Sequence, residues 1–167
     1  ADNPVARAQY QQMLAEFEQV TFCRGDGGFS RHGRDDPPSA PFDWQGGGDA
    51  PDLTATVRTA PQQALIYRLS GDMNPLHADP AVARAAGFDR PILHGLATMG
   101  MAGHALSRIA DGATLRGLRG RLAAPVFPGE SLRLQAWAVE DRFHFRMING
   151  TGREVLSLGC AEIQHVS

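Results

Sequence analysis

The densest cluster of reactive side chains in the sequence is formed by Asp72, Asn74 and His77. It lies in the run SGDMNPLHAD, residues 70–79, whose glycine and proline exclude a continuous helix and predict a structured turn. A carboxylate and an imidazole in one such turn can converge on a single water molecule, and histidine moves protons in either direction near neutral pH. Spacing alone leaves a second interpretation open, in which Asp72 and Asn74 are ordinary turn residues.

The composition of the 167-residue chain excludes several other kinds of chemistry. All 16 basic residues are arginine, and the absence of lysine rules out a lysine Schiff base and a P-loop phosphate site. The net charge of −2 gives no reason to expect nucleic-acid binding. The two cysteines, Cys23 and Cys160, are too few for a disulfide framework or a cysteine-based zinc site, and they favour a reducing, cytoplasmic location.

Hydrophobic spacing and turn residues predict the elements that must position this cluster. The predicted order begins with a helix over 3–19, a glycine- and proline-rich segment over 24–52, a strand over 53–58, a helix opened by Pro61, a short helix capped by Asp79, and a longer helix from about Gly95 to Ala110. Four strands follow, over 115–126, 131–139, 142–148 and 153–164, the last two joined by a turn at Asn149-Gly150.

The helix predicted from about Gly95 carries several small residues, among them Gly100, Ala102 and Gly103. Because glycine inside a helix costs about 1 kcal/mol relative to alanine, we expect another backbone to pack closely against this helix. One helix followed by an antiparallel meander indicates an α+β protein, and a sheet that curls around one central helix would accommodate both.

The run YRLSGDMNPLHADPAVARAAGFDRPILHGLATMG, residues 67–100, closely resembles the hydratase motif of MaoC-like dehydratases. It is most similar to the (R)-specific enoyl-CoA hydratase domain of the peroxisomal multifunctional enzymes and their bacterial relatives. Weaker similarity covers RGDGGF at 24–29 and RLAAPVFPGESL at 121–132. The resemblance implies an α+β hot-dog fold, in which an antiparallel sheet wraps around a central helix.

The resemblance also implies roles for individual residues. Asp72 and His77 take the positions of the catalytic dyad, and Asn74 matches the asparagine of the site. Gly95 matches the residue whose backbone N–H points at the thioester carbonyl, and Leu122 matches a substrate-lining position. A helix N-terminus independently suits the role of Gly95, because its N–H groups have no intrahelical partners and its dipole favours negative charge.

Other candidates in the sequence are interpreted as structural or stay open. His94 belongs to the matching motif, and we interpret it as structural. Six arginines could hold the phosphates of CoA, for which the guanidinium group is well suited, although a surface role for each stays open. They are Arg24, Arg31, Arg34, Arg116, Arg119 and Arg121.

The resemblance implies a hydro-lyase that adds water reversibly to trans-2-enoyl-CoA and gives (3R)-3-hydroxyacyl-CoA, a reaction of fatty acid β-oxidation. We expect no metal and no redox cofactor, because the sequence has no cluster of ligands and the reaction moves no electrons. Two alternatives stay open: a hot-dog acyl-CoA thioesterase, and a non-catalytic acyl-thioester-binding subunit of a heteromeric dehydratase.

Related hydratase domains carry two hot-dog halves, and this sequence holds only the half with the dyad. We divide it into a helical leader at 1–20, a glycine- and proline-rich linker with the first strand at 21–60, and a hot-dog hydratase domain at 61–167. The other half would come from a second copy in a homodimer, from a different chain in a heteromer, or from sequence outside these residues. The expected partners are thus an acyl-CoA substrate and a second hot-dog unit, with neither nucleic acid nor membrane.

Overall fold

The computed structural model describes residues 15–19, 44, 46–48, 50–109 and 114–164. The chain divides into two compact units, Ala1–Pro41 and Phe42–Ser167. In the first unit, residues 15–19 are exposed and have no regular secondary structure. The helix predicted over 3–19 is therefore wrong for these residues, because an exposed segment gains no packing energy to offset the cost of helix formation. The earlier part of that helix lies outside the described residues, as do residues 24–43.

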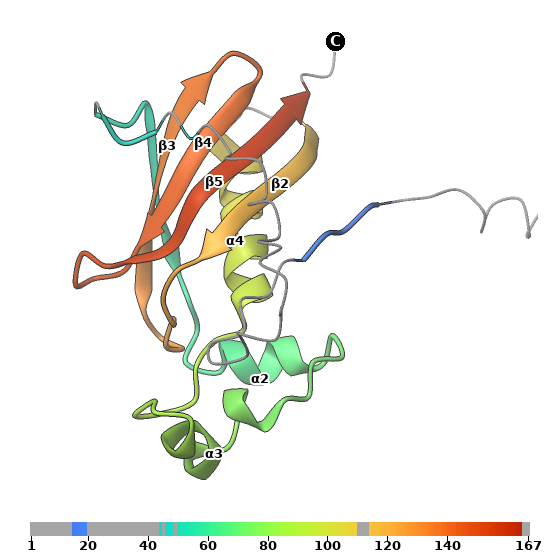
Figure 1. The fold of residues 1–167 in the computed structure, drawn as a ribbon, viewed down its shortest axis with the longest axis vertical. Helices are drawn as coiled ribbons and strands as arrows, with labels where there is room; N and C mark the ends of the chain where they lie inside the picture. The colour runs from blue at the N-terminus through green and yellow to red at the C-terminus, as the bar shows by residue number, and fades with distance from the viewer. Residues whose placement is uncertain (1–14, 20–43, 45, 49, 110–113, 165–167) are drawn as a thin grey trace, which may run out of the picture. The chain divides into compact units, whose positions relative to one another are not determined.

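The second unit is built on a five-stranded antiparallel sheet with the strand order β1-β3-β4-β5-β2. The strands are β1 (Leu53–Arg58), β2 (Thr114–Leu122), β3 (Ser131–Val139), β4 (Arg142–Ile148) and β5 (Glu154–Gln164). Helix α4 (Gly95–Ile109) runs along one face of the curved sheet and contacts β1, β2 and β5 (Figure 1). This arrangement confirms the predicted α+β class and hot-dog fold.

The core lies between the sheet and α4. The alternating pattern of β3 and β4 turns Leu132, Leu134, Phe145 and Met147 inward, where they pack with Leu106 of α4. Each of these side chains is at most 1% exposed. Full burial of one such side chain contributes about 1.5–3 kcal/mol, so the two-residue period of these strands holds the sheet against the helix.

At Gly100 and Gly103 of α4 no other backbone among the described residues lies against the helix, so the prediction is wrong at these two positions. A Cβ at Gly103 would meet only the side chains of Leu115 and Leu118 from β2, and a Cβ at Gly100 would have nothing within 4 Å. The leucine side chains of β2 occupy the space between helix and sheet. The small residues therefore make room for side chains on one face of α4 and leave open space on another.

The hairpin between β4 and β5 is longer than the predicted two-residue turn. The N–H of Asn149 donates to the carbonyl of Arg153, and Asn149 Oδ1 accepts the backbone N–H groups of Thr151 and Arg153. The glycine in the left-handed region is Gly152, with φ of +83°, rather than Gly150. The Asn149 side chain satisfies the N–H groups of the loop and so favours this wider turn.

Three short elements connect β1 to α4 and carry the predicted site. They are α2 (Gln63–Arg68), the single-turn 3-10 helix η1 (Pro75–His77) and α3 (Pro80–Ala85). Figure 1 shows α2 and α3 beyond one end of the sheet, near the start of α4. Asp79 caps α3 as predicted, since its Oδ1 accepts the N–H of Ala81 at 2.7 Å.

In the part of the chain that the structure describes, no helix has the length and apolar character needed to cross a membrane.

Candidate active site

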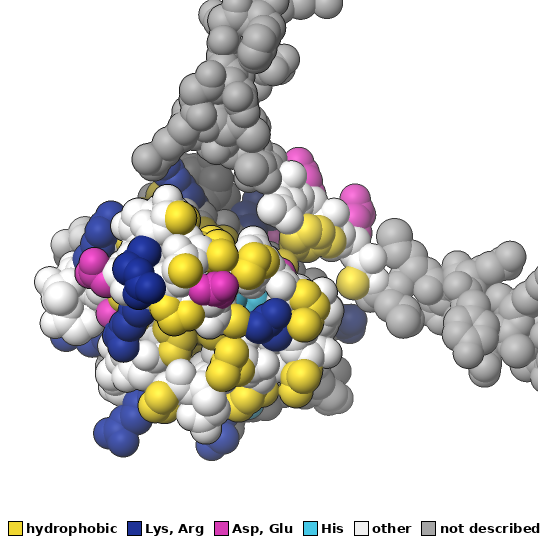
Figure 2. Space-filling view, turned by 90° about the horizontal axis from the view of Figure 1, so that it is seen from below, with side chains coloured by type: hydrophobic (Ala, Val, Ile, Leu, Met, Phe, Trp, Pro, Cys, Tyr) yellow, Lys and Arg dark blue, Asp and Glu magenta, His cyan; other side chains and the backbone are white. Residues whose placement is uncertain are grey.

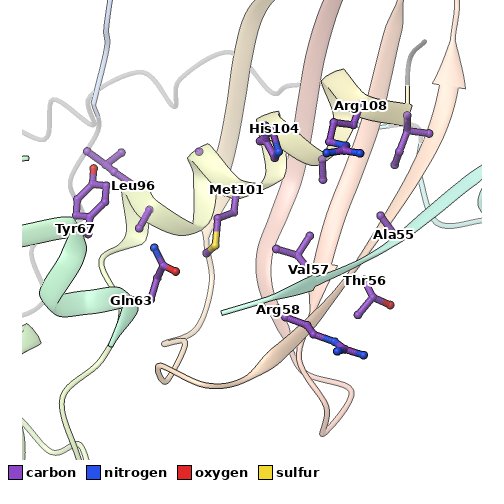
Figure 3. A pocket seen from close by; sticks show the side chains of 14 residues that line it. Ala55, Thr56, Val57, Arg58, Gln63, Tyr67, Leu96, Met101, His104 and Arg108 are labelled. Carbon is purple, nitrogen blue, oxygen red and sulfur yellow. The ribbon is translucent and has the colours of Figure 1, made fainter. Parts of the chain in front are cut away.

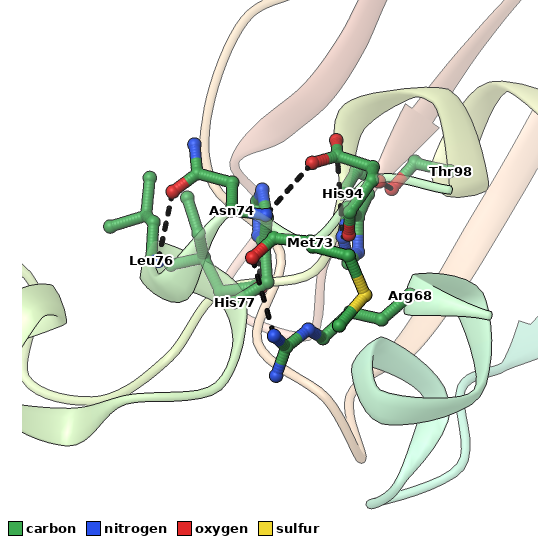
Figure 4. Close-up of polar contacts among 9 residues, drawn as sticks. Arg68, Met73, Asn74, Leu76, His77, His94 and Thr98 are labelled. Carbon is green, nitrogen blue, oxygen red and sulfur yellow. Dashed lines mark hydrogen bonds and ion pairs between the residues drawn. The ribbon is translucent and has the colours of Figure 1, made fainter. Parts of the chain in front are cut away.

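The turn before η1 is held by hydrogen bonds that centre on Asn74. Its N–H donates to Asp72 Oδ1 at 3.2 Å, and its Oδ1 accepts the N–H of Leu76 at 3.0 Å (Figure 4). Its carbonyl accepts the N–H of His77 at 3.2 Å. Asn74 therefore ties Asp72 to the backbone of His77, and its side-chain oxygen caps η1 instead of bonding the imidazole ring.

His77 is the last residue of η1, and its ring is held in a defined tautomer. Its side chain is buried, and its Nδ1 lies 2.8 Å from the carbonyl oxygen of Ile92. A carbonyl can only accept a hydrogen bond, so the neutral ring carries its proton on Nδ1 and leaves Nε2 as an acceptor. In the neutral ring, Nε2 is therefore the atom that can accept a proton.

The Asp72 carboxylate and the His77 ring lie close together without bonding each other directly. Each offers an atom within 4.8 Å of the other, and no hydrogen bond joins their side chains among the described residues. Two hydrogen bonds of about 2.8 Å can span such a separation through one water molecule. The Asp72 side chain is 52% exposed, so water reaches it freely.

His94 contacts both members of the predicted dyad. It is 2% exposed, and its ring stacks on His77 with the ring centroids 3.7 Å apart and the planes at 27°. Its Nε2 lies 3.3 Å from the backbone carbonyl of Asp72 and 3.9 Å from Asp72 Oδ2. The ring of Tyr67 packs on it at a centroid distance of 4.6 Å. Burial, and then the neighbouring His77, lower the pKa of His94 from its usual value of 6.5.

From the sequence we interpret His94 as structural, although one signal in the sequence could have suggested a functional role. It directly precedes Gly95 within the motif that resembles the hydratases. Its contact with His77, however, depends on how the turn and η1 fold back against the start of α4. Spacing along the chain does not report that geometry.

Asp72, His77 and His94 form a cluster that resembles a metal site, because one potential ligand atom from each lies within 4.8 Å of the others. Zinc needs ligand nitrogens at about 2.0–2.1 Å with their lone pairs aimed at the ion. Two stacked rings whose planes differ by only 27° cannot aim lone pairs at one point that close to both. The geometry therefore fits proton transfer better than metal binding.

Gly95 is the first residue of α4, where the N–H groups have no intrahelical partners. Together with His77 it lines a pocket of about 250 Å³. Leu122, at the end of β2, lines the same pocket and packs on Gly95 so closely that a Cβ there would overlap Leu122 Cδ1. The structure thus brings three of the predicted site residues to one small pocket.

A larger pocket of about 570 Å³ lies between β1 and α4 (Figure 3). Its walls are mainly apolar, and Tyr67 and Leu96 mark the end that is nearest in sequence to the site. None of the predicted dyad, oxyanion or substrate-lining residues lines it. Among the described residues, its lining includes the imidazole of His104 but no carboxylate, so it does not hold a pair like Asp72 and His77.

The three arginine candidates that the structure describes do not line the pocket at the predicted site. Arg116 donates to Gln164 Oε1 at 2.6 Å, and Arg119 lies 3.5 Å from Glu162, both across the β2–β5 pair. Neither of these nor Arg121 lines either pocket. The other three arginines, Arg24, Arg31 and Arg34, lie outside the described residues.

The structure is a hot-dog fold in which the candidate pair Asp72 and His77 lies near the start of the central helix, and comparison with known proteins gives the family. A family model described as "MaoC like domain" matches residues 45–158. The chain belongs to the MaoC-like family. It is 40% identical over 151 residues to peroxisomal multifunctional enzyme type 2 of Drosophila melanogaster, which covers 87% of this chain.

Two further proteins show how widely this similarity extends. The chain is 44% identical over 120 residues to the enoyl-CoA hydratase ChsH3 of Mycobacterium tuberculosis, which covers 70% of this chain. The crystal structure of a MaoC-like dehydratase from Phytophthora capsici matches with a TM-score of 0.73 and 34% identity, over 77% of this chain and 47% of that one. The chain spans 25% of the Drosophila protein and 40% of the mycobacterial one.

Proposed function

We propose that this chain is the dyad-bearing half of an enoyl-CoA hydratase, which adds water reversibly to trans-2-enoyl-CoA and forms (3R)-3-hydroxyacyl-CoA. The observation that carries the proposal is the placement of the Asp72 carboxylate within 4.8 Å of the His77 ring, beside the pocket that His77 shares with Gly95. Membership of the MaoC-like family supports the reaction class. The similarity of residues 67–100 to the (R)-specific branch supports the configuration of the product.

In the proposed mechanism, the thioester carbonyl accepts a hydrogen bond from the Gly95 N–H while Leu122 packs against the bound thioester. A water molecule held by Asp72 and His77 loses a proton to the pair as its oxygen bonds to the β-carbon. The electrons of the double bond move toward the carbonyl, and the Gly95 N–H stabilises the enolate-like oxygen. One such donor is worth about 3–4 kcal/mol in comparable sites.

The second step returns a proton to the α-carbon from the same side, so that one water molecule is added overall. Because Asp72 and His77 lie within reach of one water, both can hold it in place. The His77 Nε2 that is left free by the Ile92 hydrogen bond supplies the accepting lone pair. Asn74 acts by holding the turn.

We further propose a second hot-dog unit beside β2, as a homodimer or a heteromer. In the described part of the chain β2 pairs only with β5, so one of its edges has no partner strand. The end of the molecule that carries α2 also exposes apolar side chains, which Figure 2 shows gathered on that face. They include Leu65, Ile66, Leu69 and Met73.

The two cysteines support a cytoplasmic location.

A hydration assay with crotonyl-CoA tests the proposed reaction, once the mass of the assembly in solution is known. Loss of the enoyl thioester absorbance with the thioester intact supports the hydratase. Release of free CoA would instead support a thioesterase. Binding of the thioester without turnover would support a non-catalytic subunit.

A further inference from the structure

His94 contacts the catalytic pair in a way that the proposed chemistry does not use. It is fully enclosed by protein and lines neither the small pocket with His77 and Gly95 nor the larger pocket beside α4. Its ring therefore has no route by which to exchange a proton with a bound substrate. Any effect that it has on the reaction must pass through the residues it touches.

The hydrogen bonding of His94 fixes its protonation state. The carbonyl oxygen of Asp72 can only accept, so His94 Nε2 carries the proton and donates it at 3.3 Å. The other nitrogen, Nδ1, is buried and has no hydrogen-bond partner among the described residues. A second proton on Nδ1 would be a buried N–H without an acceptor, next to the ring of His77. The ring is therefore neutral when the site is intact.

This neutral ring restrains both members of the pair. The hydrogen bond from His77 Nδ1 to the Ile92 carbonyl fixes one edge of the His77 ring. The plane of the ring can still tilt about the line of this hydrogen bond. Stacking on His94 at 3.7 Å removes this freedom and so fixes the direction of the Nε2 lone pair. The Nε2–H of His94 meanwhile holds the backbone of Asp72, whose carboxylate would otherwise move with an exposed turn.

We propose that His94 is the positioning residue of the Asp72–His77 pair, through a stacked ring on one side and a hydrogen bond to the backbone on the other. This inference rests on the proposed hydratase function for its kinetic test. Because His94 directly precedes Gly95, the same residue couples the geometry of the pair to the start of α4, where the thioester carbonyl is expected to dock.

Two substitutions separate the two contacts. His94→Gln keeps a donor near the position of Nε2 but removes the stacked ring, and His94→Phe keeps the ring but removes the donor. Small misplacements of reacting groups cost up to roughly 100-fold in rate, so each variant should lower kcat by about 10- to 100-fold with KM changed less than about 3-fold. His104→Gln makes the same chemical change at an exposed site on α4 and should leave kcat unchanged.

A second readout does not depend on turnover. NMR relaxation of the carbon-13-labelled His77 ring reports whether its orientation is fixed. The ring should be fixed in the wild type and in His94→Phe, which both stack a ring on it, and should exchange between orientations in His94→Gln. The groups that face His94 are Tyr67 and Arg68 from α2, Asp72 from the turn and His77 from η1. Tyr67→Leu, which removes a ring that packs on His94, should loosen the His77 ring in the same direction.

The outcomes are distinct. Reduced kcat in both variants, together with a mobile His77 ring in His94→Gln and a fixed one in His94→Phe, supports the proposal, and circular dichroism checks that both are folded. Wild-type kcat in both variants, or a His77 ring that stays fixed in His94→Gln, overturns it. If the wild type hydrates no enoyl-CoA, the hydratase function fails while the measurement of ring mobility still decides the role of His94.

Discussion

The rings of His77 and His94 stack with their centroids 3.7 Å apart, although the two residues belong to different elements. His77 ends the short helix η1, and His94 comes directly before α4. The stack joins the turn that carries Asp72 to the helix start that carries Gly95. The site is therefore one unit that is held together across two elements.

Replacement of either member of the pair should abolish most of the hydration activity. Asp72→Asn and His77→Gln each remove a group that holds and deprotonates the water, so each should lower the hydration rate by at least about 100-fold. The measurement is kcat for crotonyl-CoA with each purified variant, with circular dichroism to confirm folding. Asp89→Asn and His104→Gln, at exposed positions, are the matched controls. Wild-type turnover in either dyad variant would contradict the assignment.

A methyl group at Gly95 should harm the site, whereas one at Gly100 should not. In Gly95→Ala the new Cβ overlaps Leu122 Cδ1, so Leu122 must move within the pocket where the thioester docks. We expect kcat/KM to fall at least 10-fold, which is about 1.4 kcal/mol of transition-state stabilisation. Gly100→Ala has open space and should keep full activity with a gain of up to about 1 kcal/mol in unfolding free energy. Equal activities of the two variants would refute the proposed role of Gly95.

Acid should destabilise the fold through His94. Burial holds the pKa of His94 below its usual 6.5, so the unfolded chain binds a proton at a higher pH than the native protein does. The stabilisation is therefore fully present above pH 6.5 and is lost as the pH falls through 6.5 toward the lowered pKa. Urea unfolding at pH 7.5 and 5.5 should show a smaller loss in His94→Gln than in the wild type or in His104→Gln. An equal loss in all three would contradict the burial of a neutral His94.

The edge of β2 that has no partner strand among the described residues should be covered in solution. An exposed strand edge is a template for pairing with another strand, so we expect a dimer or a heteromer whose sheets join at β2. Light scattering at micromolar concentration gives the mass, and the specific activity on dilution reports whether assembly is needed for turnover. A stable monomer with full activity would rule out this arrangement.

Much of the fold could be predicted from the sequence, because local patterns dictate it. The bounds of β3 and β4 match the predicted 131–139 and 142–148, where apolar and polar residues alternate over a core. The strand predicted over 115–126 ends instead at Leu122. Its continuation includes Pro125, which lacks the N–H that a strand ladder requires.

Features that depend on distant contacts could not be predicted in the same way. The strand order, with β1 beside β3 and β2 beyond β5, follows from pairings between residues far apart in the chain. The candidate site residues Asp72, His77 and Gly95 were predicted through the resemblance of one motif, since the spacing of Asp72 and His77 also fits an ordinary turn. The stack of His94 on His77 depends on how two segments fold together, and no local pattern encodes it.

Coupled hydration of crotonyl-CoA tests the central claim most directly. The product is offered in parallel to two stereospecific dehydrogenases, one for each 3-hydroxyacyl-CoA enantiomer, and NADH formation is followed. In the proposed mechanism Asp72, His77 and the Gly95 N–H approach the enoyl group from one fixed direction, so we predict a single enantiomer. The similarity to the (R)-specific branch predicts that the signal comes only with the (3R)-specific enzyme. A signal only with the (3S)-specific enzyme, or none with either while the thioester is consumed, would contradict the account.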